Sequence, residues 1–544
     1  MMMKMKIKLN TNLICKRSIS QHLTIHAMKL KSPINFHVDL LKVPSNFGYY
    51  TSRVNRMYNE DRWQTSILDL KPDELINKKS TLNNDKLIEE TNRVKEPKYT
   101  ANSPPIDRTI FAFGVFDGHG GDECSSYLKN HLYENIENLC INEDTILKLK
   151  DFYKLKISGY WKRWGRRIGD VMVSECKIEN KVKLFIDEVN EKHGIVKKVD
   201  NTVDEIDHDH DHDHDDDNEN EMDEKFIEWD DFSNGKKLWL VLNMMINEKK
   251  LTHWEIFKIR IWLGYLFTDY QFLTFENAQN ELRLSKNKSK DIEDIKRKII
   301  HSGSTCTSFF TYPLKWKNDN NNRYFYQDNV LSRLVVAHVG DTRAIICDKD
   351  GLAHSLTKDH HPSNPIESSR LRKLSAGLIM TDSFGEERFL NFANTRSFGD
   401  ISAKNVGITS EPEISEYLIG NSTMIEEFKN DEDNFEIINN NEIKDFGGDE
   451  GFIVLISDGI TNNLSDQEIV DLIMMNFNNK GNNKGNPMNG SREVVEFVQC
   501  INGDDNATCL VIRLNGWGKW PINDRTGKLR EERMMDAGYK SFDR

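Results

Sequence analysis

The fold of this chain is decided at residues 111–121, where the sequence is FAFGVFDGHGG. This apolar run, which contains aromatic and β-branched residues, predicts a buried strand, so that Asp117 lies where the strand leaves the core. The glycines at 118, 120 and 121 let the main chain approach a bound ion or phosphate closely. A helix is expected next, because apolar residues recur on one helical face at Cys124, Leu128, Leu132, Ile136 and Leu139.

A strand followed by an acid appears again near the C-terminal end. Residues 452–457, FIVLIS, run into Asp458, and a capping box from Ser465 to Glu468 predicts a helix after it. Asp505 precedes a further apolar strand at 508–512. The pattern therefore predicts several carboxylates delivered from strand ends.

A fourth acidic position lies upstream, at Glu60 and Asp61, with Arg56 a few residues before them. Carboxylates of this kind suit hard divalent cations such as Mg²⁺ or Mn²⁺, which prefer oxygen ligands. Each acid taken alone is better explained as a loop or cap residue. Their combination favours a metal site.

The chain resembles the metal-dependent type 2C Ser/Thr protein phosphatases, and among them the fungal mitochondrial members. The matching segments keep the order of that family over most of residues 50–514. They are 56–61 (RMYNED), 115–121 (VFDGHGG), 302–305 (SGST), 339–343 (VGDTR), 359–362 (DHHP), 396–400 (RSFGD), 411–414 (EPEI), 457–459 (SDG) and 505–506 (DN).

The resemblance implies an α+β fold, in which two packed antiparallel β-sheets are flanked by helices and a binuclear metal site lies at one end. Local patterns agree with short strands and turns. Residues 334–339 and 344–347, joined by a turn at 340–343, predict a hairpin buried in such a sheet.

The resemblance also implies roles for individual residues. Asp117 would bridge two Mg²⁺ or Mn²⁺ ions, Glu60 and the Gly118 carbonyl would complete one ion's protein ligands, and Asp458 and Asp505 would hold the other. Asp61 would orient the attacking water from outside the ligand shell. The implied reaction is direct hydrolysis of a phosphoserine or phosphothreonine ester by a water that bridges both metals.

Two further side chains are expected to act on the substrate. Arg56 would hold the phosphate through its planar guanidinium; Arg53 is a competing candidate, but Arg56 keeps the family's interval to Glu60. His119 would protonate the departing seryl or threonyl oxygen as general acid. The alternative for His119 is a turn residue that hydrogen-bonds within its own loop.

The chain departs from the family pattern at two positions. Where many members carry an acid two residues before SGST that helps to bind a third metal, this chain has Ile300, and where a second acid often follows Asp458-Gly459 it has Asn462. Because isoleucine does not coordinate cations, the sequence predicts a two-metal site with a third site weak or absent.

Composition describes a large, polar chain. Its 544 residues are 38% hydrophobic and 30% charged, with a net charge of −13, which argues against nucleic-acid binding. No stretch of 18 apolar residues occurs, so no membrane span is expected. Eight cysteines without a Cys-x-x-Cys spacing predict neither a zinc site nor a disulfide framework. The expected partners are phosphorylated proteins.

The N-terminal segment 1–38 contains no Asp or Glu, and its Lys and Arg residues are interleaved with Met, Leu, Ile, Ser and Thr. That composition is typical of a mitochondrial transit peptide, and the alternative is a disordered basic tail. The interpretation favoured here is mitochondrial localisation.

The remaining organisation follows from composition. Residues 39–515 are expected to form the phosphatase domain, with a long helical and disordered insertion at about 143–300. Within it, residues 204–217 alternate Asp with His; this tract is better explained as a solvated linker than as a site for Zn²⁺, Ni²⁺ or Cu²⁺. The tail 516–544 is expected to pack back through Trp517 and Trp520.

The sequence thus predicts a mitochondrial Ser/Thr phosphatase, with pyruvate dehydrogenase or another matrix phosphoprotein as the substrate hypothesis. The first alternative is a catalytically silent type 2C fold that serves as a binding scaffold. Silent relatives usually lose metal-bridging acids, whereas this chain keeps the four acids Glu60, Asp117, Asp458 and Asp505. The second alternative, a metal-storing protein built on the tract 204–217, predicts that deletion of this tract abolishes function.

Overall fold

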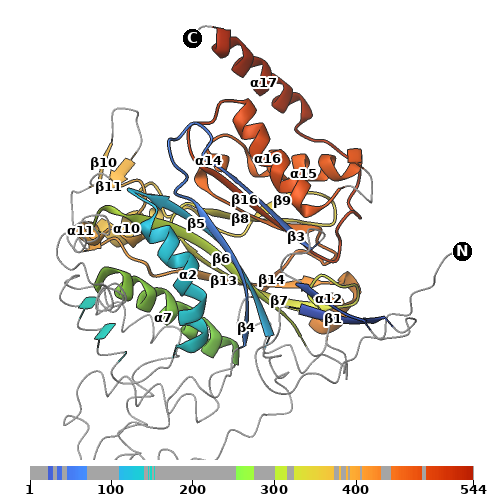
Figure 1. Ribbon diagram of the computed structural model, residues 1–544, viewed down its shortest axis with the longest axis horizontal. Coiled ribbons are helices and arrows are strands. Elements are labelled where there is room, and N and C mark those ends of the chain that lie inside the picture. The colour runs from blue at the N-terminus through green and yellow to red at the C-terminus, as the bar shows by residue number, and fades with distance from the viewer. Residues whose placement is uncertain are drawn as a thin grey trace, which may run out of the picture.

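A computed structural model gives the architecture of the chain (Figure 1). The residues that it describes are 22–27, 34–39, 46–69, 109–139, 145, 148–149, 152–153, 253–274, 300–314, 324–372, 379–381, 387–389, 392–404, 407–430, 443–480 and 485–542. The Asp-His tract at 204–217 and most of the segment 143–300 lie outside them.

The larger sheet has seven strands. Six of them lie in the order β14-β13-β7-β6-β5-β4, and β12 pairs with β6. Their bounds are β4 Arg62–Asp69, β5 Thr109–His119, β6 Gly303–Pro313, β7 Leu331–Val339, β12 Phe398–Gly399, β13 Glu413–Gly420 and β14 Lys444–Asp445. Neighbouring strands are antiparallel except for β13 and β14.

The smaller sheet has five antiparallel strands in the order β3-β16-β15-β8-β9. They are β3 Phe47–Ser52, β8 Arg343–Cys347, β9 Ala353–Ser355, β15 Phe452–Ile456 and β16 Ala507–Arg513. Two small hairpins stand apart from both sheets, β1 His22–Ala27 with β2 Ile34–Asp39 and β10 Ile379–Thr381 with β11 Glu387–Phe389.

Helices cover the outer faces of the two sheets (Figure 1). On the larger sheet these are α2 Glu123–Asn138 and α7 His253–Thr274; on the smaller they are α14 Asp458–Thr461, α15 Asp466–Lys480 and α16 Pro487–Cys500. The other helices are α10 Pro365–Arg372, α11 Ile401–Lys404, α12 Ser422–Lys429 and α17 Gly527–Phe542. The result is the four-layer sandwich that the sequence predicts.

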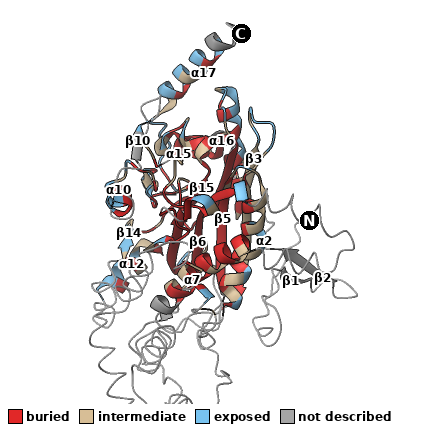
Figure 2. Ribbon diagram, turned by 90° about the vertical axis from the view of Figure 1, so that its left-hand side faces the viewer, coloured by how far each residue is buried: buried red, intermediate tan, exposed pale blue. Residues whose placement is uncertain are grey.

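Successive side chains of each strand point to opposite faces of its sheet, and both faces are buried, so the strands are apolar throughout. In β5, Phe113 and Val115 point between the sheets and pack with Ile453 and Leu455 of the opposite sheet, while Phe116 points outward against α2 and α7. Both faces are therefore covered, and buried residues run along the centre of the molecule (Figure 2).

The predicted hairpin at 334–347 is wrong. Its two strands, β7 and β8, belong to different sheets, with β7 paired to β6 and β13 and β8 paired to β15 and β9. The turn at 340–342 therefore crosses from one layer of the sandwich to the other. Both strands are apolar on both faces, and such runs carry no alternation that would show which sheet each one joins.

The segment 143–300, expected as an insertion, contains α7, which belongs to the helical layer on the larger sheet. Helix α7 packs beside α2, and its Phe257, Ile261 and Tyr265 are buried against the larger sheet. The tail after residue 515 packs back on the domain as expected: Trp517 and Trp520 are buried and lie edge-to-face on Phe452.

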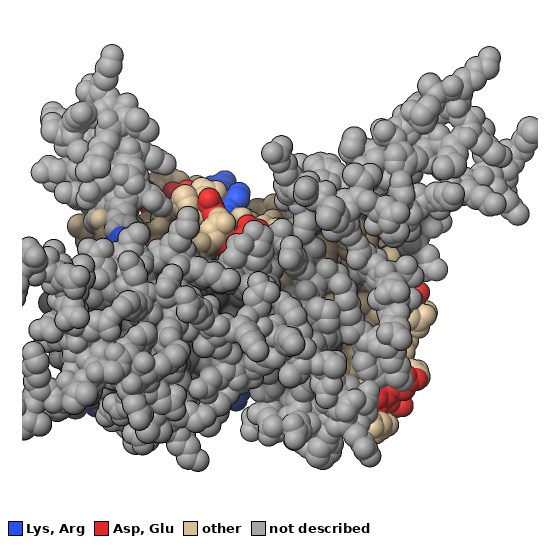
Figure 3. Space-filling view, turned by 90° about the horizontal axis from the view of Figure 1, so that it is seen from below, with Lys and Arg blue, Asp and Glu red and all other residues tan. Residues whose placement is uncertain are grey.

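None of the helices in the described part of the chain is both long and apolar enough to cross a bilayer. Where described residues are visible from below, acidic and basic side chains are both present at the surface, without a continuous basic stretch (Figure 3).

Candidate metal centre and active site

The acids singled out from the sequence meet at one end of the sandwich because the strands are antiparallel. The C-terminal end of β5 lies beside the start of β4, where Arg62 pairs with Phe116. In the other sheet the C-terminal end of β15 lies beside the starts of β16 and β8. Residues that precede or follow these ends are therefore brought together from both sheets.

Three carboxylates lie closest together. The Asp458 N–H donates to Asp117 Oδ2 at 3.3 Å, across 341 residues of sequence. Ser457 Oγ donates to Asp61 Oδ2 at 2.8 Å, across 396 residues, and itself accepts from the Thr508 N–H at 2.9 Å. The Asp61 carboxylate is 3% exposed.

Burial, and after it the crowding of like charges, raises the pKa values of this cluster. Desolvation, and then the charges of Asp61, Asp458 and Asp341, hold the pKa of Asp117 well above its usual range. Desolvation followed by the charge of Asp341 raises the pKa of Asp458 to about 8, and desolvation raises that of Asp61 to about 6. The cluster is thus a place where positive charge would be strongly stabilised.

Glu60 and Gly118 lie side by side at the edge of the cluster. Glu60 Oε1 accepts the Gly121 N–H at 2.9 Å, and its carbonyl accepts from Ser125 Oγ at 2.5 Å. A Cβ added to Gly118 would lie 2.6 Å from that same carbonyl oxygen. Only glycine lets the main chain approach Glu60 so closely at this point.

Asn506, which precedes β16 of the smaller sheet, hydrogen-bonds the loop that carries Glu60. The sequence interpretation gave Asn506 no role. Asn506 Oδ1 accepts the Glu60 N–H at 2.8 Å, and its Nδ2 donates to the carbonyl of Tyr58 at 2.9 Å. Two adjacent residues before β16 therefore contribute to the site: Asp505 supplies a carboxylate, and Asn506 holds the Glu60 loop by hydrogen bonds.

Arg56 and Asp505, expected to bind phosphate and metal respectively, form an ion pair with each other. Arg56 Nη2 lies 2.8 Å from Asp505 Oδ2, and its Nε donates to the Asp504 carbonyl at 3.0 Å. The Arg56 side chain is 55% exposed, so this pair is weak and exchanges readily for another anion. Arg53, the competing candidate, donates to the Arg56 carbonyl instead.

His119 lies at the end of β5 with its ring against a buried acid, Asp400. Its Nε2 is 2.9 Å from Asp400 Oδ2, and the His119 side chain is 41% exposed. Burial lowers the pKa of His119, but the charge of Asp400 and its hydrogen bond outweigh burial and raise that pKa above its usual range. His119 therefore favours the protonated form that a general acid requires.

Asp341, which the sequence interpretation used only as part of a turn, contributes a further carboxylate to the cluster. Its charge raises the pKa values of both Asp117 and Asp458, and Asn394 Nδ2 donates to its Oδ2 at 2.9 Å. The lack of an acid at the exposed Ile300 therefore does not by itself argue against a further ion here. The clue in the sequence was the same as for Asp117, an acid at the end of an apolar strand.

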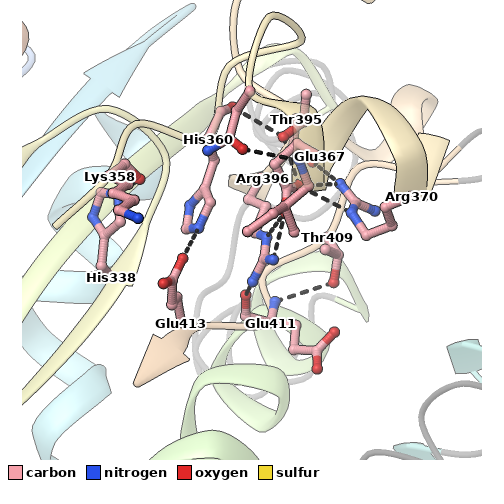
Figure 4. Close-up of polar contacts among 12 residues, drawn as sticks. His338, Lys358, His360, Glu367, Arg370, Thr395, Arg396, Thr409, Glu411 and Glu413 are labelled. Carbon is pink, nitrogen blue, oxygen red and sulfur yellow. Dashed lines mark hydrogen bonds and ion pairs between the residues drawn. The ribbon is translucent and has the colours of Figure 1, made fainter. Parts of the chain in front are cut away.

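A buried polar network supports the turn that carries Asp341 (Figure 4). His360 Nδ1 accepts the Gly340 N–H at 3.0 Å, while the His360 N–H donates to the Gly340 carbonyl at 2.8 Å. Behind His360, Glu367 of α10 accepts from Arg396 at 2.6 Å, and from Arg370 and Thr395. His360 and Arg396 belong to the matched segments 359–362 and 396–400, so these segments support the turn that carries Asp341.

The residues at this end fit divalent cations. Asp61 Oδ1 is buried without a hydrogen-bond donor among the described residues, and the donors are carboxylate and carbonyl oxygens, which Mg²⁺ and Mn²⁺ prefer. No three His, Cys, Asp or Glu side chains of the described ranges converge as a single ready-made ligand set. Mg²⁺ commonly takes only one or two carboxylates and keeps several waters, so a pair of ions needs no such set.

Comparison with known proteins agrees with this geometry. The family model described as "Protein phosphatase 2C" matches residues 265–428 and 437–507. The fission yeast protein "Protein phosphatase 2C homolog 4" of Schizosaccharomyces pombe is 27% identical over 498 residues, which cover 91% of this chain and 87% of that protein. These matches support a type 2C protein phosphatase.

Other similarities of the phosphatase cover less of its length or are more distant. "Protein phosphatase 1K, mitochondrial" of Xenopus laevis is 30% identical over 187 residues, which span 34% of this chain and 40% of that protein. The solved serine-threonine phosphatase 2C from Toxoplasma gondii covers 87% of this chain with 12% identity and a TM-score of 0.39. The family-model match and the fission yeast relative support a protein Ser/Thr phosphatase, and the matched family generally uses Mg²⁺ or Mn²⁺.

Proposed function

We propose that this phosphatase hydrolyses phosphoserine and phosphothreonine esters of proteins at the acid-lined end of its sandwich. One observation carries the proposal. Asp458 lies 341 residues after Asp117 in the sequence, yet Asp61, Asp117 and Asp458 lie together with raised pKa values. Such crowding is costly for the apo fold and is relieved by bound cations.

The proposal assigns protein ligands for two ions. Asp117, Glu60, the Gly118 carbonyl, Asp458 and Asp505 would hold them. When bound, two divalent cations lower the pKa of water and neutralise the oxygens of the transferred phosphoryl group. Asp61 acts beside them, where its free Oδ1 accepts a hydrogen bond from the attacking water and aligns it.

Two side chains of the chain act on the substrate itself. Arg56, exposed and paired with Asp505, exchanges this carboxylate for the phosphate oxygens. His119, held by Asp400, gives its proton to the departing seryl or threonyl oxygen.

The test is hydrolysis of a phosphothreonine peptide in Mn²⁺, in Mg²⁺ and in excess chelator. We expect turnover with either metal and loss of turnover in chelator, restored when the metal is returned. Release of phosphate that continues undiminished in excess chelator would contradict the proposal. A protein that binds the peptide without turning it over would instead support the scaffold alternative.

Arg56→Ala is expected to lower kcat/KM on the peptide by about 10–100-fold, because a hydrogen bond to a charged group contributes roughly 1.5–3 kcal/mol and each 1.36 kcal/mol is tenfold. Arg56→Lys should recover only part of the loss, since an ammonium does not reproduce the planar fork. Arg53→Ala is the matched control and should change kcat/KM by less than about twofold. A larger loss in the Arg53 variant would transfer the phosphate-binding role to Arg53.

We further propose that the phosphatase acts in mitochondria on a matrix phosphoprotein, with pyruvate dehydrogenase as the substrate hypothesis. The acid-free composition of residues 1–38 supports the localisation. So does the similarity to a Xenopus protein whose name includes "mitochondrial". Residues 1–40 fused to a fluorescent reporter should carry it to mitochondria, and a diffuse cytosolic distribution would refute the localisation.

The metal-storage alternative rests on the tract 204–217, which lies outside the described residues. The candidate centre is formed without it. Deletion of residues 204–217 is therefore expected to leave peptide hydrolysis nearly unchanged, whereas the storage alternative requires that deletion to abolish function.

A further inference from the structure

A buried carboxylate, Asp400, lies behind the His119 ring. Asp400, 5% exposed, places Oδ2 at 2.9 Å and Oδ1 at 3.1 Å from His119 Nε2. The other ring nitrogen, Nδ1, makes no hydrogen bond to any residue that the structure describes. The ring is thus held by one nitrogen and leaves the other available.

Gly303 makes room for this contact. It is the first residue of β6 and pairs with His119 across the sheet. A Cβ at position 303 would lie 2.2 Å from His119 Nε2 and 2.6 Å from both carboxylate oxygens of Asp400. Any side chain larger than that of glycine would force the imidazole and the carboxylate apart.

Asp400 is held in a backbone conformation that few residues adopt. Its φ is +49°, and that of the preceding Gly399 is +70°. Aspartate tolerates this left-handed region better than most residues. Ser397 Oγ donates to Asp400 Oδ2, and the Asp400 N–H donates to the Ser302 carbonyl at 3.3 Å. A conformation of this kind persists only where the surroundings enforce it.

The enforcing contact comes from α7, inside the segment 143–300. Asp269 of α7 accepts the Gly399 N–H on Oδ1 at 2.8 Å, and its Oδ2 is 2.9 Å from Lys404 Nζ. Lys404 Nζ also donates to the Ser397 carbonyl at 2.7 Å. Asp269 and Lys404 are both fully buried, so this ion pair braces both ends of the loop that presents Asp400.

We propose that Asp400 is the positioning residue of His119: it fixes the imidazole with Nε2 toward the protein and Nδ1 toward the leaving oxygen, and the Asp269–Lys404 ion pair fixes Asp400. The proposal rests on the proposed function of His119 as general acid. As the bond from phosphorus to the seryl or threonyl oxygen breaks, the Nδ1 proton passes to that oxygen. The water oxygen forms the new bond to phosphorus and releases one proton to solvent, and the neutral imidazole regains a proton from solvent.

The test compares two leaving groups in Mn²⁺, a phosphothreonine peptide and p-nitrophenyl phosphate. The peptide's alkoxide needs a proton in order to leave, whereas p-nitrophenolate leaves as a stable anion. Asp400→Asn keeps the volume and tolerates the positive φ. It should lower kcat on the peptide by about 10²-fold, the lower end of a general-acid contribution, and kcat on p-nitrophenyl phosphate by less than about threefold, with KM little changed.

The double variant with His119→Ala separates this inference from the proposed function. Asp400→Asn should add little to the loss caused by His119→Ala, because the two side chains act as one unit. Equal losses of the Asp400 variant on both substrates, or losses that add in the double variant, would overturn the positioning role alone. If His119→Ala itself lacks the peptide-selective loss, the general-acid assignment falls, and the positioning role with it.

Two further variants guard against a trivial loss of fold. Asp269→Asn combined with Lys404→Met removes the buried ion pair without leaving either charge unpaired. It should give the same peptide-selective loss on a smaller scale, and an unchanged ratio between the two substrates would refute the bracing role. Asp348→Asn is the matched control, since Asp348, just after β8, binds His354 Nε2 of β9 at 2.7 Å; its substrate ratio should equal that of wild type.

Discussion

Asp117→Asn is expected to lower kcat/KM on a phosphothreonine peptide by at least about 10³-fold, since the loss of roughly 4 kcal/mol of metal-dependent stabilisation corresponds to that factor. The substitution removes one negative charge at nearly constant volume. The same variant should raise the melting temperature of the metal-free protein, because Asp117 is crowded by Asp61, Asp458 and Asp341. Peptide assays and thermal unfolding with and without Mn²⁺ measure both effects.

The thermal shift caused by Mn²⁺ is the decisive readout. Wild type should be stabilised by the metal, because a ligand that binds only the folded state raises its stability, and Asp117→Asn should lose most of that shift. Asp458→Asn should behave in the same way. Asp445→Asn, on the edge strand β14 and paired with Lys429, serves as the control and should retain both activity and shift. An Asp117 variant with a full Mn²⁺ shift would show that this acid is not a ligand.

Glu367→Gln is expected to lower the free energy of unfolding by about 3–5 kcal/mol, the usual cost of removing one partner from a buried ion pair. Glu367 is 1% exposed and lies against Arg396 and Arg370, which are 3% and 7% exposed. Burial alone would raise the pKa of Glu367, but the two guanidinium groups outweigh it and hold that pKa well below its usual range. The substitution removes the buried carboxylate charge that both guanidinium groups share.

Urea unfolding at pH 7 measures this effect directly. Glu413→Gln is the control at the other side of His360, because the Glu413 side chain is 51% exposed. It should change the free energy of unfolding by less than about 1 kcal/mol, as is usual for exposed pairs. Equal destabilisation by the two variants would show that the Glu367 network does not depend on its buried charge.

Local patterns in the sequence predicted several elements correctly. The apolar run that ends at Asp117 is β5, the helical face that starts at Cys124 belongs to α2, and the capping box at Ser465 holds the start of α15, where Glu468 Oε2 accepts the Ser465 N–H at 2.8 Å. Each of these features is set by periodicity or hydrogen bonding within a single segment.

The errors and omissions concern contacts between distant segments. The pair β7 and β8 was expected to form one hairpin, but the strands join different sheets. Asp341 and Asp400 were quoted only as parts of matched segments, although one joins the acid cluster and the other holds His119. Such contacts depend on which strands and helices pack together, and no local pattern records that.

The sequence by itself determined the chemistry that is available: oxygen donors at strand ends, one histidine and one arginine, in the order of a phosphatase family. Only the tertiary structure decided which of them meet. It brings Ser457 to Asp61 across 396 residues and His119 to Asp400 across 281, and it pairs Arg56 with Asp505. The physical reason is that residue types fix what a side chain can bind, while its neighbours are fixed by the burial of two sheets and their helices around a shared core.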